Sequence, residues 1–157
     1  MGGNQQIPTR FEVEHAVAIA REAHEGQFDK AGRPYIGHPL RVMAGVRGAA
    51  EQMAAVLHDV IEDTSVTADG LLALGCPPQV VSAVIALSKQ PGEQQAHYLR
   101  RVAADPLALA VKRADIADNT DPQRLSLLEP AVQDRLRAKY TTASRLLDEY
   151  ERELALG

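Results

Sequence analysis

Apolar residues recur at intervals of three and four along most of the chain, which is the spacing of one face of an α-helix. The first such stretch predicts a helix from an N-cap at Thr9 through Ala23. No stretch shows the sustained alternation of apolar and polar residues that is typical of a half-buried strand. The pattern therefore predicts an all-α fold. Further helices are expected from Pro39 onward, over Ala50–Ile61, from an N-cap at Thr67 to Leu74, from Pro77-Pro78 to Pro91-Gly92, over Glu93–Ala104, from Pro106 onward, and over Leu125–Leu156 as one long helix or a broken pair.

The chain has no internal repeat, low-complexity segment or linker-like stretch, so we expect one domain over residues 9–157. Residues 1–8, with their glycines and glutamine pair, are expected to form a flexible leader. The segment Gln27–Gly37 carries glycine, proline and charges of both signs, which predicts an ordered loop between two helices.

Composition narrows the classes of function. The 157 residues are 45% hydrophobic and carry 17 Lys+Arg against 21 Asp+Glu, a net charge of −4. A domain of this length buries roughly 70% of its unfolded surface, so any metal would serve function and not folding alone. The mild acidity and the lack of a basic, aromatic-rich stripe exclude a general nucleic-acid binder, but a local cation cluster could still hold a small anionic substrate.

One cysteine, Cys76, excludes an internal disulfide framework and fits a reducing compartment. No apolar run approaches the roughly 18 residues of a membrane span, and the first ten residues lack the pattern of a signal peptide. We therefore expect a cytoplasmic protein without a membrane partner.

The segment 53–63 concentrates polar chemistry on one helix face. At 100° per residue, its apolar residues share one arc, and the opposite arc carries His58, Asp59, Glu62 and Asp63. The simpler interpretation of such a run of charged residues is an acidic helix face that points to solvent. However, carboxylates at a helix C-terminus oppose the helix dipole, so we expect positive charge nearby.

A second carboxylate is predicted to point inward. Leu107, Val111, Asp115 and Asn119 fall at successive i+4 positions, and the two apolar members place this stripe toward the core. A buried, ionised Asp115 requires a cation, a hydrogen-bond shell or a metal. An ion pair with Lys112 or another basic residue and a metal site both satisfy this requirement.

Together with a histidine that precedes Pro39, these residues form a possible metal-binding set of His38, His58, Asp59 and Asp115. A lone histidine at a helix start is more often a capping or packed residue. His38 is therefore a candidate metal ligand only because His58, Asp59 and Asp115 accompany it. Two imidazoles and two carboxylates, without a thiolate, suit Mn²⁺, Fe²⁺, Co²⁺, Mg²⁺ or Zn²⁺ and leave positions open for water and a phosphate oxygen. The remaining histidines are expected on the surface (His15, His97) or packed near the end of the first helix (His24).

Five sequence motifs, in their order along the chain, resemble those of the HD-domain phosphohydrolases. The resemblance is in particular to the hydrolase domain of RelA/SpoT-type alarmone enzymes and to the small stand-alone hydrolases. The motifs are AHEGQFDK at 23–30, PYIGHPL at 34–40, AAVLHDVIEDT at 54–64, ALSK at 86–89 and VKRADIADN at 111–119. A single His-Asp pair is a weak signal, whereas the whole series is specific. The resemblance covers most of the segment from Ala16 to Asn119.

This resemblance implies an all-α HD-domain bundle that removes the 3′-pyrophosphate of (p)ppGpp with Mn²⁺, giving GDP or GTP and pyrophosphate. It assigns the metal to His38, His58, Asp59 and Asp115. The acidic pair Glu62 and Asp63 would activate water, as general base and proton relay. Substrate contacts would come from Lys30 and Asn119, and more weakly from Lys89, Tyr98 and Arg101. Because no synthetase-type domain fits after Gly157, hydrolysis alone is expected.

The chain departs from the family pattern at two places. Asp29 stands where alarmone hydrolases usually have Arg before a Lys, and the residues between Asp115 and Asn119 lack the usual Arg-Leu-His. An anion beside a highly charged substrate weakens its binding unless Arg33 or Arg41 compensates. The alternatives are therefore an HD-type hydrolase of another nucleotide or phosphoester and a non-catalytic nucleotide-sensing module.

Overall fold

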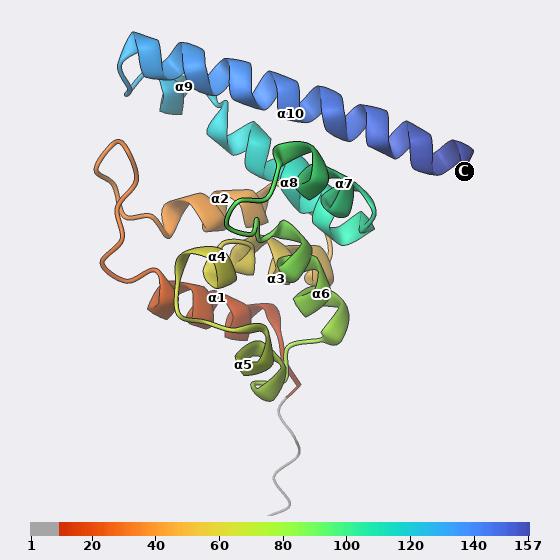
Figure 1. Ribbon diagram of the computed structural model, residues 1–157. Coiled ribbons are helices and arrows are strands. Elements are labelled where there is room, and N and C mark those ends of the chain that lie inside the picture. The colour runs from red at the N-terminus through yellow and green to blue at the C-terminus, as the bar shows by residue number, and fades with distance from the viewer. Residues whose placement is uncertain (1–9) are drawn as a thin grey trace, which may run out of the picture.

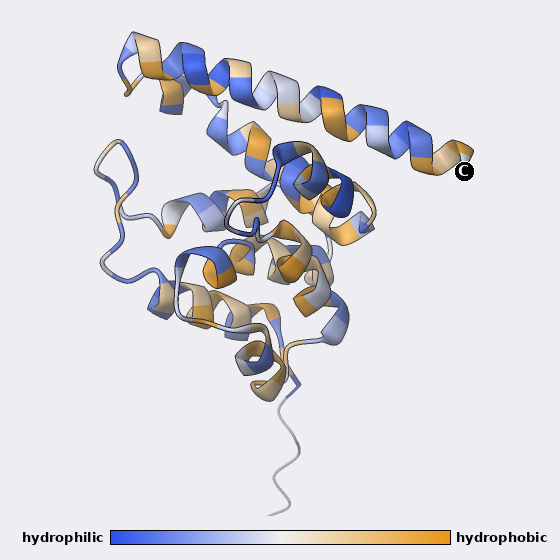
Figure 2. Ribbon diagram, viewed as in Figure 1, coloured by the Kyte–Doolittle hydropathy of each residue, from blue (hydrophilic) through white to orange (hydrophobic). Residues whose placement is uncertain are grey.

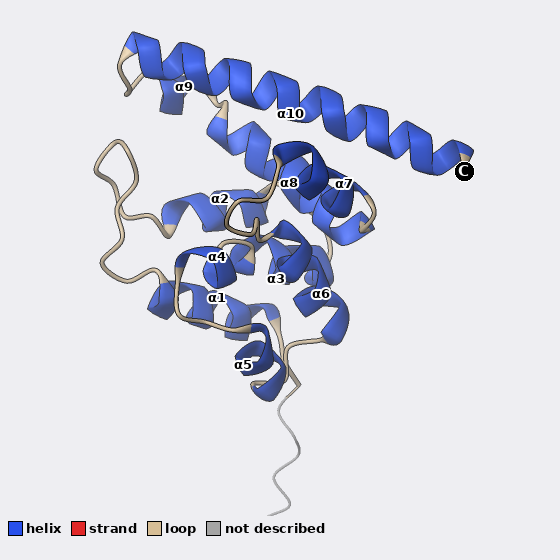
Figure 3. Cartoon of the chain, viewed as in Figure 1, coloured by secondary structure: helices blue, strands red, loops and turns tan. Residues whose placement is uncertain are grey.

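The computed structural model describes residues 10–157, and the expected leader and the Thr9 cap lie outside this range. Within it, helices and connecting loops account for the architecture, and the only β-type pairing is an isolated bridge between Phe28 and Pro34 (Figure 3). The all-α prediction is confirmed. The helices are α1 (Val13–Ala23), α2 (Gly37–Ala44), α3 (Ala49–Leu57), α4 (Val60–Asp63), α5 (Ala68–Ala73), α6 (Pro78–Leu87), α7 (Gln95–Ala103), α8 (Pro106–Asn119), α9 (Pro122–Leu125) and α10 (Pro130–Leu156).

Helix α3 lies at the centre of the bundle, where it contacts α1, α2, α6 and α8 (Figure 1). Its last five residues, from Met53 to Leu57, are all buried and apolar, because a helix surrounded by others has no face left for water. This position carries the end of α3 into the interior. His58 follows directly at the C-cap and is buried with it.

Helix α10 runs across one side of the bundle and packs against α7 and α8 (Figure 1). Its hydrophilic surface is interrupted by apolar residues at intervals (Figure 2), of which Ala143, Leu147 and Tyr150 are buried. Apolar residues three and four apart lie on the same helix face, so α10 docks through a narrow stripe. Of the two forms expected for the tail, the long helix is the one observed, although it begins at Pro130.

Two predicted boundaries are wrong for local reasons. Helix α1 begins at Val13 and not directly after Thr9, because the His15 side chain accepts the Glu12 N–H at 2.9 Å and starts the helix there. The helix expected over Ala50–Ile61 is broken after Leu57. The His58 Nδ1 lies 2.6 Å from the Ala55 carbonyl oxygen. In a continuous helix this oxygen would accept the backbone N–H of the residue four positions later.

Other elements match the predicted signals. The Thr67 hydroxyl accepts the Gly70 N–H at 3.0 Å and caps α5, while Pro78 and Pro106 open α6 and α8. The expected loop after α1 is a narrow hairpin, in which the Asp29 N–H donates to the Arg33 carbonyl and the Tyr35 N–H donates to the Gln27 carbonyl, both at 2.8 Å. Among the described helices, none combines the length and apolar character needed to cross a membrane.

Candidate metal centre

Four polar side chains from distant parts of the chain converge between α2, α8 and the turn that joins α3 to α4. Helix α2 contributes His38, the turn contributes His58 and Asp59, and α8 contributes Asp115. The Asp115 Oδ1 lies 2.9 Å from the His38 Nε2 and 3.5 Å from the His58 Nε2. The Asp59 Oδ2 lies 3.2 Å from the His58 Nε2 and 3.9 Å from the His38 Nε2. The structure thus brings together all four residues that the sequence singled out.

The His58 ring has one nitrogen for which the protein supplies no hydrogen-bond partner. Its Nδ1 is committed to the Ala55 carbonyl as a donor, so the neutral ring has an unprotonated Nε2. That Nε2 is buried without a hydrogen-bond partner, yet it faces oxygens of both Asp59 and Asp115. A lone pair aimed at two carboxylates is repulsive unless a proton or a metal ion lies between them, so the donor set fits a metal ion.

The spacing of the four atoms also fits. Ligands on adjacent corners of an octahedron, with bonds of about 2.1 Å, lie about 3 Å apart. The separations of 2.9, 3.2, 3.5 and 3.9 Å bracket that value closely enough for small side-chain adjustments to complete the site. The His/Asp cluster is therefore compatible with a divalent metal.

Electrostatics in the cluster favour a cation. Burial raises the cost of ionising Asp115, but Lys112 and the two histidines outweigh it and hold the pKa of this carboxyl well below its usual range. Burial likewise opposes the ionisation of Asp59, whose pKa the charge of His58 lowers to about 2. Conversely, burial lowers the pKa of His58, and the neighbouring Asp59 and Asp115 raise it well above its ordinary value. The carboxylates that draw a proton onto the ring equally attract a metal ion.

Asp115 uses its two oxygens differently. Oδ2 accepts from the Lys112 Nζ at 3.1 Å, while Oδ1 accepts from the Asn119 Nδ2 at 2.9 Å and faces the histidines. The ion pair with Lys112 that the sequence offered as an alternative is thus present beside the cluster. Asp59 is oriented by the Tyr35 hydroxyl, which donates to its Oδ2.

The acidic pair lies on α4, next to the cluster. Glu62 and Asp63 each place a carboxylate oxygen within 4.8 Å of one on Asp59. The Glu62 Oε1 accepts the backbone N–H of Lys89 at 2.7 Å. That donor is neutral, and the positive charge that lowers the pKa of Glu62 is that of Lys112. Burial raises the pKa of Glu62 despite both influences, and burial together with Asp59 raises the pKa of Asp63. Raised pKa values make both carboxylates better proton acceptors.

A cavity of about 390 Å³ opens beside the cluster and is reached by His38, Asp59 and Asp115. Besides acidic residues, its wall contains basic and apolar side chains, which suit the phosphates and the organic part of a phosphorylated ligand. The basic residues are Lys30, Arg33, Arg41, Lys112, Arg124 and Lys139. The apolar residues are Phe28, Ala31, Leu125, Leu127, Leu128 and Leu136.

The predicted substrate residues divide into two groups. Lys30 and Asn119 line the cavity. Lys89 lies beside a different surface hollow, and its Nζ donates to the Gln95 Oε1 at 3.2 Å. Tyr98 is buried and donates to the Leu87 carbonyl at 2.9 Å, and Arg101 donates to the Ser88 carbonyl at 2.8 Å and pairs with Glu93. The structure therefore does not place Lys89, Tyr98 or Arg101 in the wall of this cavity.

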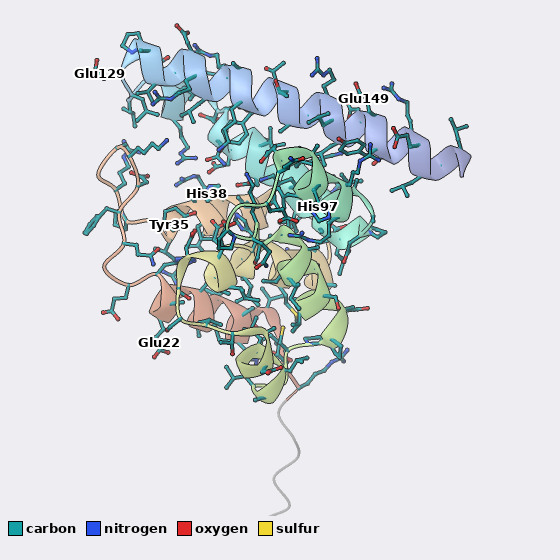
Figure 4. The ribbon with its side chains drawn as sticks, in the orientation of Figure 1. Glu22, Tyr35, His38, His97, Glu129 and Glu149 are labelled. Carbon is teal, nitrogen blue, oxygen red and sulfur yellow. The ribbon has the colours of Figure 1, made fainter. Side chains whose placement is uncertain are left out.

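Several residues that the sequence did not single out contribute to the site. Tyr35 and His38 lie close together in the middle of the molecule (Figure 4), with ring centroids 5.7 Å apart. Tyr35 belongs to the PYIGHPL motif, so the sequence could have indicated that it lies at the site. Lys139 and Tyr140 reach the cavity from α10, far outside the matched motifs, and only the tertiary fold reveals them.

The remaining histidines lie as expected. His24 is buried, its Nδ1 is 2.9 Å from the Gln27 Oε1, and His15 and His97 are exposed. The structure also shows the role of Asp29, a residue at which the sequence departs from the family pattern. Its Oδ1 accepts from the N–H groups of Ala31 and Arg33, both at 2.9 Å, so the carboxylate is used to shape the loop.

The comparisons with known proteins agree with this architecture. The chain matches no established family model. It is 36% identical over 147 residues to a guanosine-3′,5′-bis(diphosphate) 3′-pyrophosphohydrolase of Vibrio cholerae, covering 84% of this chain and 21% of that protein. It is 51% identical over 57 residues to the Haemophilus influenzae protein of the same name, covering 34% of this chain and 8% of that protein. The chain thus spans about a fifth or less of the length of these relatives.

A solved structure shares the fold over nearly the full length of both chains. It was described under the words "A metazoan ortholog of SpoT hydrolyzes ppGpp and plays a role in starvation responses". The TM-score is 0.64 at 24% identity, and the match covers 92% of this chain and 96% of the other. With sequence similarity to bacterial relatives, a shared bundle and the converging His and Asp residues, this chain is an HD domain of the RelA/SpoT type.

Proposed function

We propose that this chain is a metal-dependent phosphohydrolase that removes pyrophosphate from the 3′ position of guanosine 3′,5′-bis(diphosphate) or its triphosphate form. The observation that carries this proposal is the convergence of His38, His58, Asp59 and Asp115 next to Glu62 and Asp63, beside a cavity with basic residues in its wall. The names of the relatives supply the substrate, and the cavity supplies charges that suit it.

His38, His58, Asp59 and Asp115 would hold the ion, and Mn²⁺ is the ion that we assign. When bound, a divalent ion supplies positive charge that offsets the charge of the phosphoryl group and makes nearby water more acidic. The N and O donor set without thiolate suits Mn²⁺ better than a structural zinc.

The acidic pair would manage the proton. In the reaction, a water oxygen forms a bond to the phosphorus attached to the 3′ oxygen, and the bond between that phosphorus and the 3′ oxygen breaks. Glu62 accepts the proton that water loses, and Asp63 relays a proton to the departing 3′ oxygen. The 3′ oxygen leaves as the hydroxyl of GDP or GTP, and pyrophosphate is the other product.

The cavity wall would bind the remainder of the nucleotide. Lys30 and Lys139 offer positive charge to its phosphates, and Asn119 offers an amide beside the metal cluster. Phe28 is 67% exposed at the cavity and presents an aromatic face to a base. Closure of these contacts around substrate would orient the 3′ phosphorus toward Glu62.

Release of pyrophosphate from ppGpp with Mn²⁺ tests the proposal. We expect turnover by the purified chain, loss of turnover with EDTA, and a loss of at least a hundredfold in His58→Ala. His97→Ala, at an exposed histidine that does not line the cavity, is the matched control and is expected to keep activity. An inactive wild type that nevertheless binds Mn²⁺, or an active His58→Ala, contradicts the proposal.

Asp29 favours one second candidate, hydrolysis of another nucleotide or phosphoester. The loop places a carboxylate where alarmone hydrolases usually carry a cation, and the Arg124 Nη2 lies 3.8 Å from its Oδ2. A panel of nucleoside 3′- and 5′-phosphates, assayed beside ppGpp under the same conditions, separates the two. Faster turnover of a substrate without the 3′-pyrophosphate supports the second candidate.

A further inference from the structure

His38 is held at both ring nitrogens, and one of the two partners belongs to no assigned role. Its Nε2 faces the metal cluster, whereas its Nδ1 lies 2.6 Å from the Asp118 Oδ2. Asp118 is three residues beyond Asp115 on α8, so both point to the same side of that helix.

The partners of Asp118 determine which nitrogen of His38 carries the proton. The Arg41 Nε donates to its Oδ1 at 2.9 Å, and the Arg124 Nη1 donates to its Oδ2 at 2.6 Å. Because guanidinium groups only donate, both oxygens of Asp118 must accept, and the carboxylate is ionised. The bond to His38 is therefore an Nδ1–H donation, which leaves the Nε2 lone pair directed at the cluster.

Arg124 holds Asp118 from a separate element. Besides the carboxylate, its Nη1 reaches the Asp118 backbone carbonyl at 3.0 Å. Helix α9 is itself fixed by Asp121, whose Oδ1 accepts the backbone N–H groups of Gln123 and Arg124 at 2.9 and 3.2 Å. The chain His38, Asp118, Arg124 thus connects the metal cluster to α9.

We propose that Asp118 is a positioning residue of the metal centre, which fixes the ring and the tautomer of His38 for metal binding, and that Arg124 keeps Asp118 in place. Outer carboxylates of this kind typically change metal affinity by ten- to a hundredfold when they are removed. The inference rests on the metal site of the proposed function, but not on the identity of the substrate.

Metal binding without nucleotide is the appropriate readout. Mn²⁺ is titrated by calorimetry into the metal-free full chain, for the wild type, Asp118→Leu, Asp118→Asn and the control Asp134→Asn. Leu has a similar volume but no acceptor, so we expect Asp118→Leu to weaken Mn²⁺ binding by about ten- to a hundredfold. Asn retains one oxygen for His38 and loses the charge, so a loss below tenfold is expected. The side chain of Asp134 is 82% exposed, and its substitution should leave affinity unchanged.

A purely structural ion pair predicts a different outcome. In that case Asp118→Leu lowers the melting temperature while the Mn²⁺ affinity stays within threefold of the wild type, and this result overturns the inference. A wild type that binds no Mn²⁺ overturns the proposed function as well. Normal binding by both wild type and Asp118→Leu overturns only the role of Asp118.

Arg124→Gln keeps the inference testable should Asp118→Leu fail to fold. Its side chain is 25% exposed and contacts none of the four assigned ligands. We expect a severalfold loss of Mn²⁺ affinity in the wild-type background and little further loss when Asp118→Asn is already present, because the two act through one contact. Equal losses in both backgrounds, or no loss in either, contradict the proposal.

Discussion

Glu62 and the four proposed metal ligands lie side by side, and the proposed function gives their side chains different tasks. Glu62 is bound by the Lys89 N–H and faces the cavity, outside the His38, His58 and Asp115 cluster. Removal of a general base typically costs 10²- to 10⁴-fold in rate, whereas removal of a ligand also costs metal. Rate and metal affinity therefore separate the two roles.

We expect Glu62→Gln to lower kcat for ppGpp by at least about a hundredfold while the Mn²⁺ affinity stays within about threefold. Steady-state kinetics and calorimetry on the same preparation measure both quantities. Glu22→Gln is the matched control, because Glu22 points away from the bundle on α1 (Figure 4). A parallel fall in kcat and metal affinity would instead make Glu62 a ligand.

Cys76 illustrates how burial alone sets the reactivity of a residue. The thiol is 2% exposed, and burial raises its pKa to about 11. The thiolate is the nucleophile, and at pH 8 only about 0.1% of such a thiol is ionised. We expect alkylation by iodoacetamide at pH 8 to be at least about a hundredfold slower than that of free cysteine.

The denatured chain provides the control for this measurement. With a single cysteine, it should take up one label per molecule at the rate of an ordinary thiol, as read by mass spectrometry. Rapid labelling of the folded protein would show that the segment before α6 opens readily, contrary to its burial.

Among the elements, α8 shows most clearly how a local capping residue positions side chains of the site. Its N-cap Asp105 accepts the Leu107 and Ala108 N–H groups at 2.9 and 3.2 Å, and fourteen residues of helix then carry Asp115 and Asn119. Loss of such a cap typically costs about 1 kcal/mol. The position of Asp115 thus depends partly on a residue nearly three turns away.

We expect Asp105→Ala to lower the free energy of unfolding by about 1 kcal/mol and Asp105→Asn by less than about 0.5 kcal/mol, because Asn also caps well. Urea denaturation followed by circular dichroism measures both. Equal losses in the two variants would mean that the charge of Asp105, and not its capping bonds, is what stabilises α8.

The sequence was sufficient for most elements and for the cluster, and the reasons differ. Helical periodicity and the prolines at 78 and 106 marked the helices, and inward-facing Asp115 followed from the same periodicity. The turn at His58 was missed because a side-chain bond to the Ala55 carbonyl overrides a continuous apolar pattern. Lys139 was missed because it contacts the cavity only through the docking of α10.

At the scale of the molecule, the His/Asp cluster joins elements that also meet through apolar packing and, between α2 and α8, through the Arg41–Asp118 ion pair. Its four residues come from α2, the α3–α4 turn and α8, around the central helix. Two buried histidines and two carboxylates without a cation are costly to the folded state. An ion that binds only the folded chain shifts the folding equilibrium toward it.

We expect Mn²⁺ at about a hundred times its dissociation constant to stabilise the fold by about 2.7 kcal/mol, which raises the melting temperature by roughly 5–10 °C for a domain of this length. Thermal unfolding followed by circular dichroism, with and without EDTA, measures the shift. The shift should vanish in His58→Ala and persist in His97→Ala. An equal shift in both variants would place the ion elsewhere.

The contact of Arg124 with both Asp118 and Asp29 has an evolutionary consequence. An arginine at position 29 would face the guanidinium of residue 124, and a neutral residue at 118 would leave that guanidinium without its carboxylate. Drift at any one of the three positions is therefore penalised until another compensates. Across descendants of a common ancestor, they should vary as a linked trio, with acid at 29 and 118 accompanying arginine at 124.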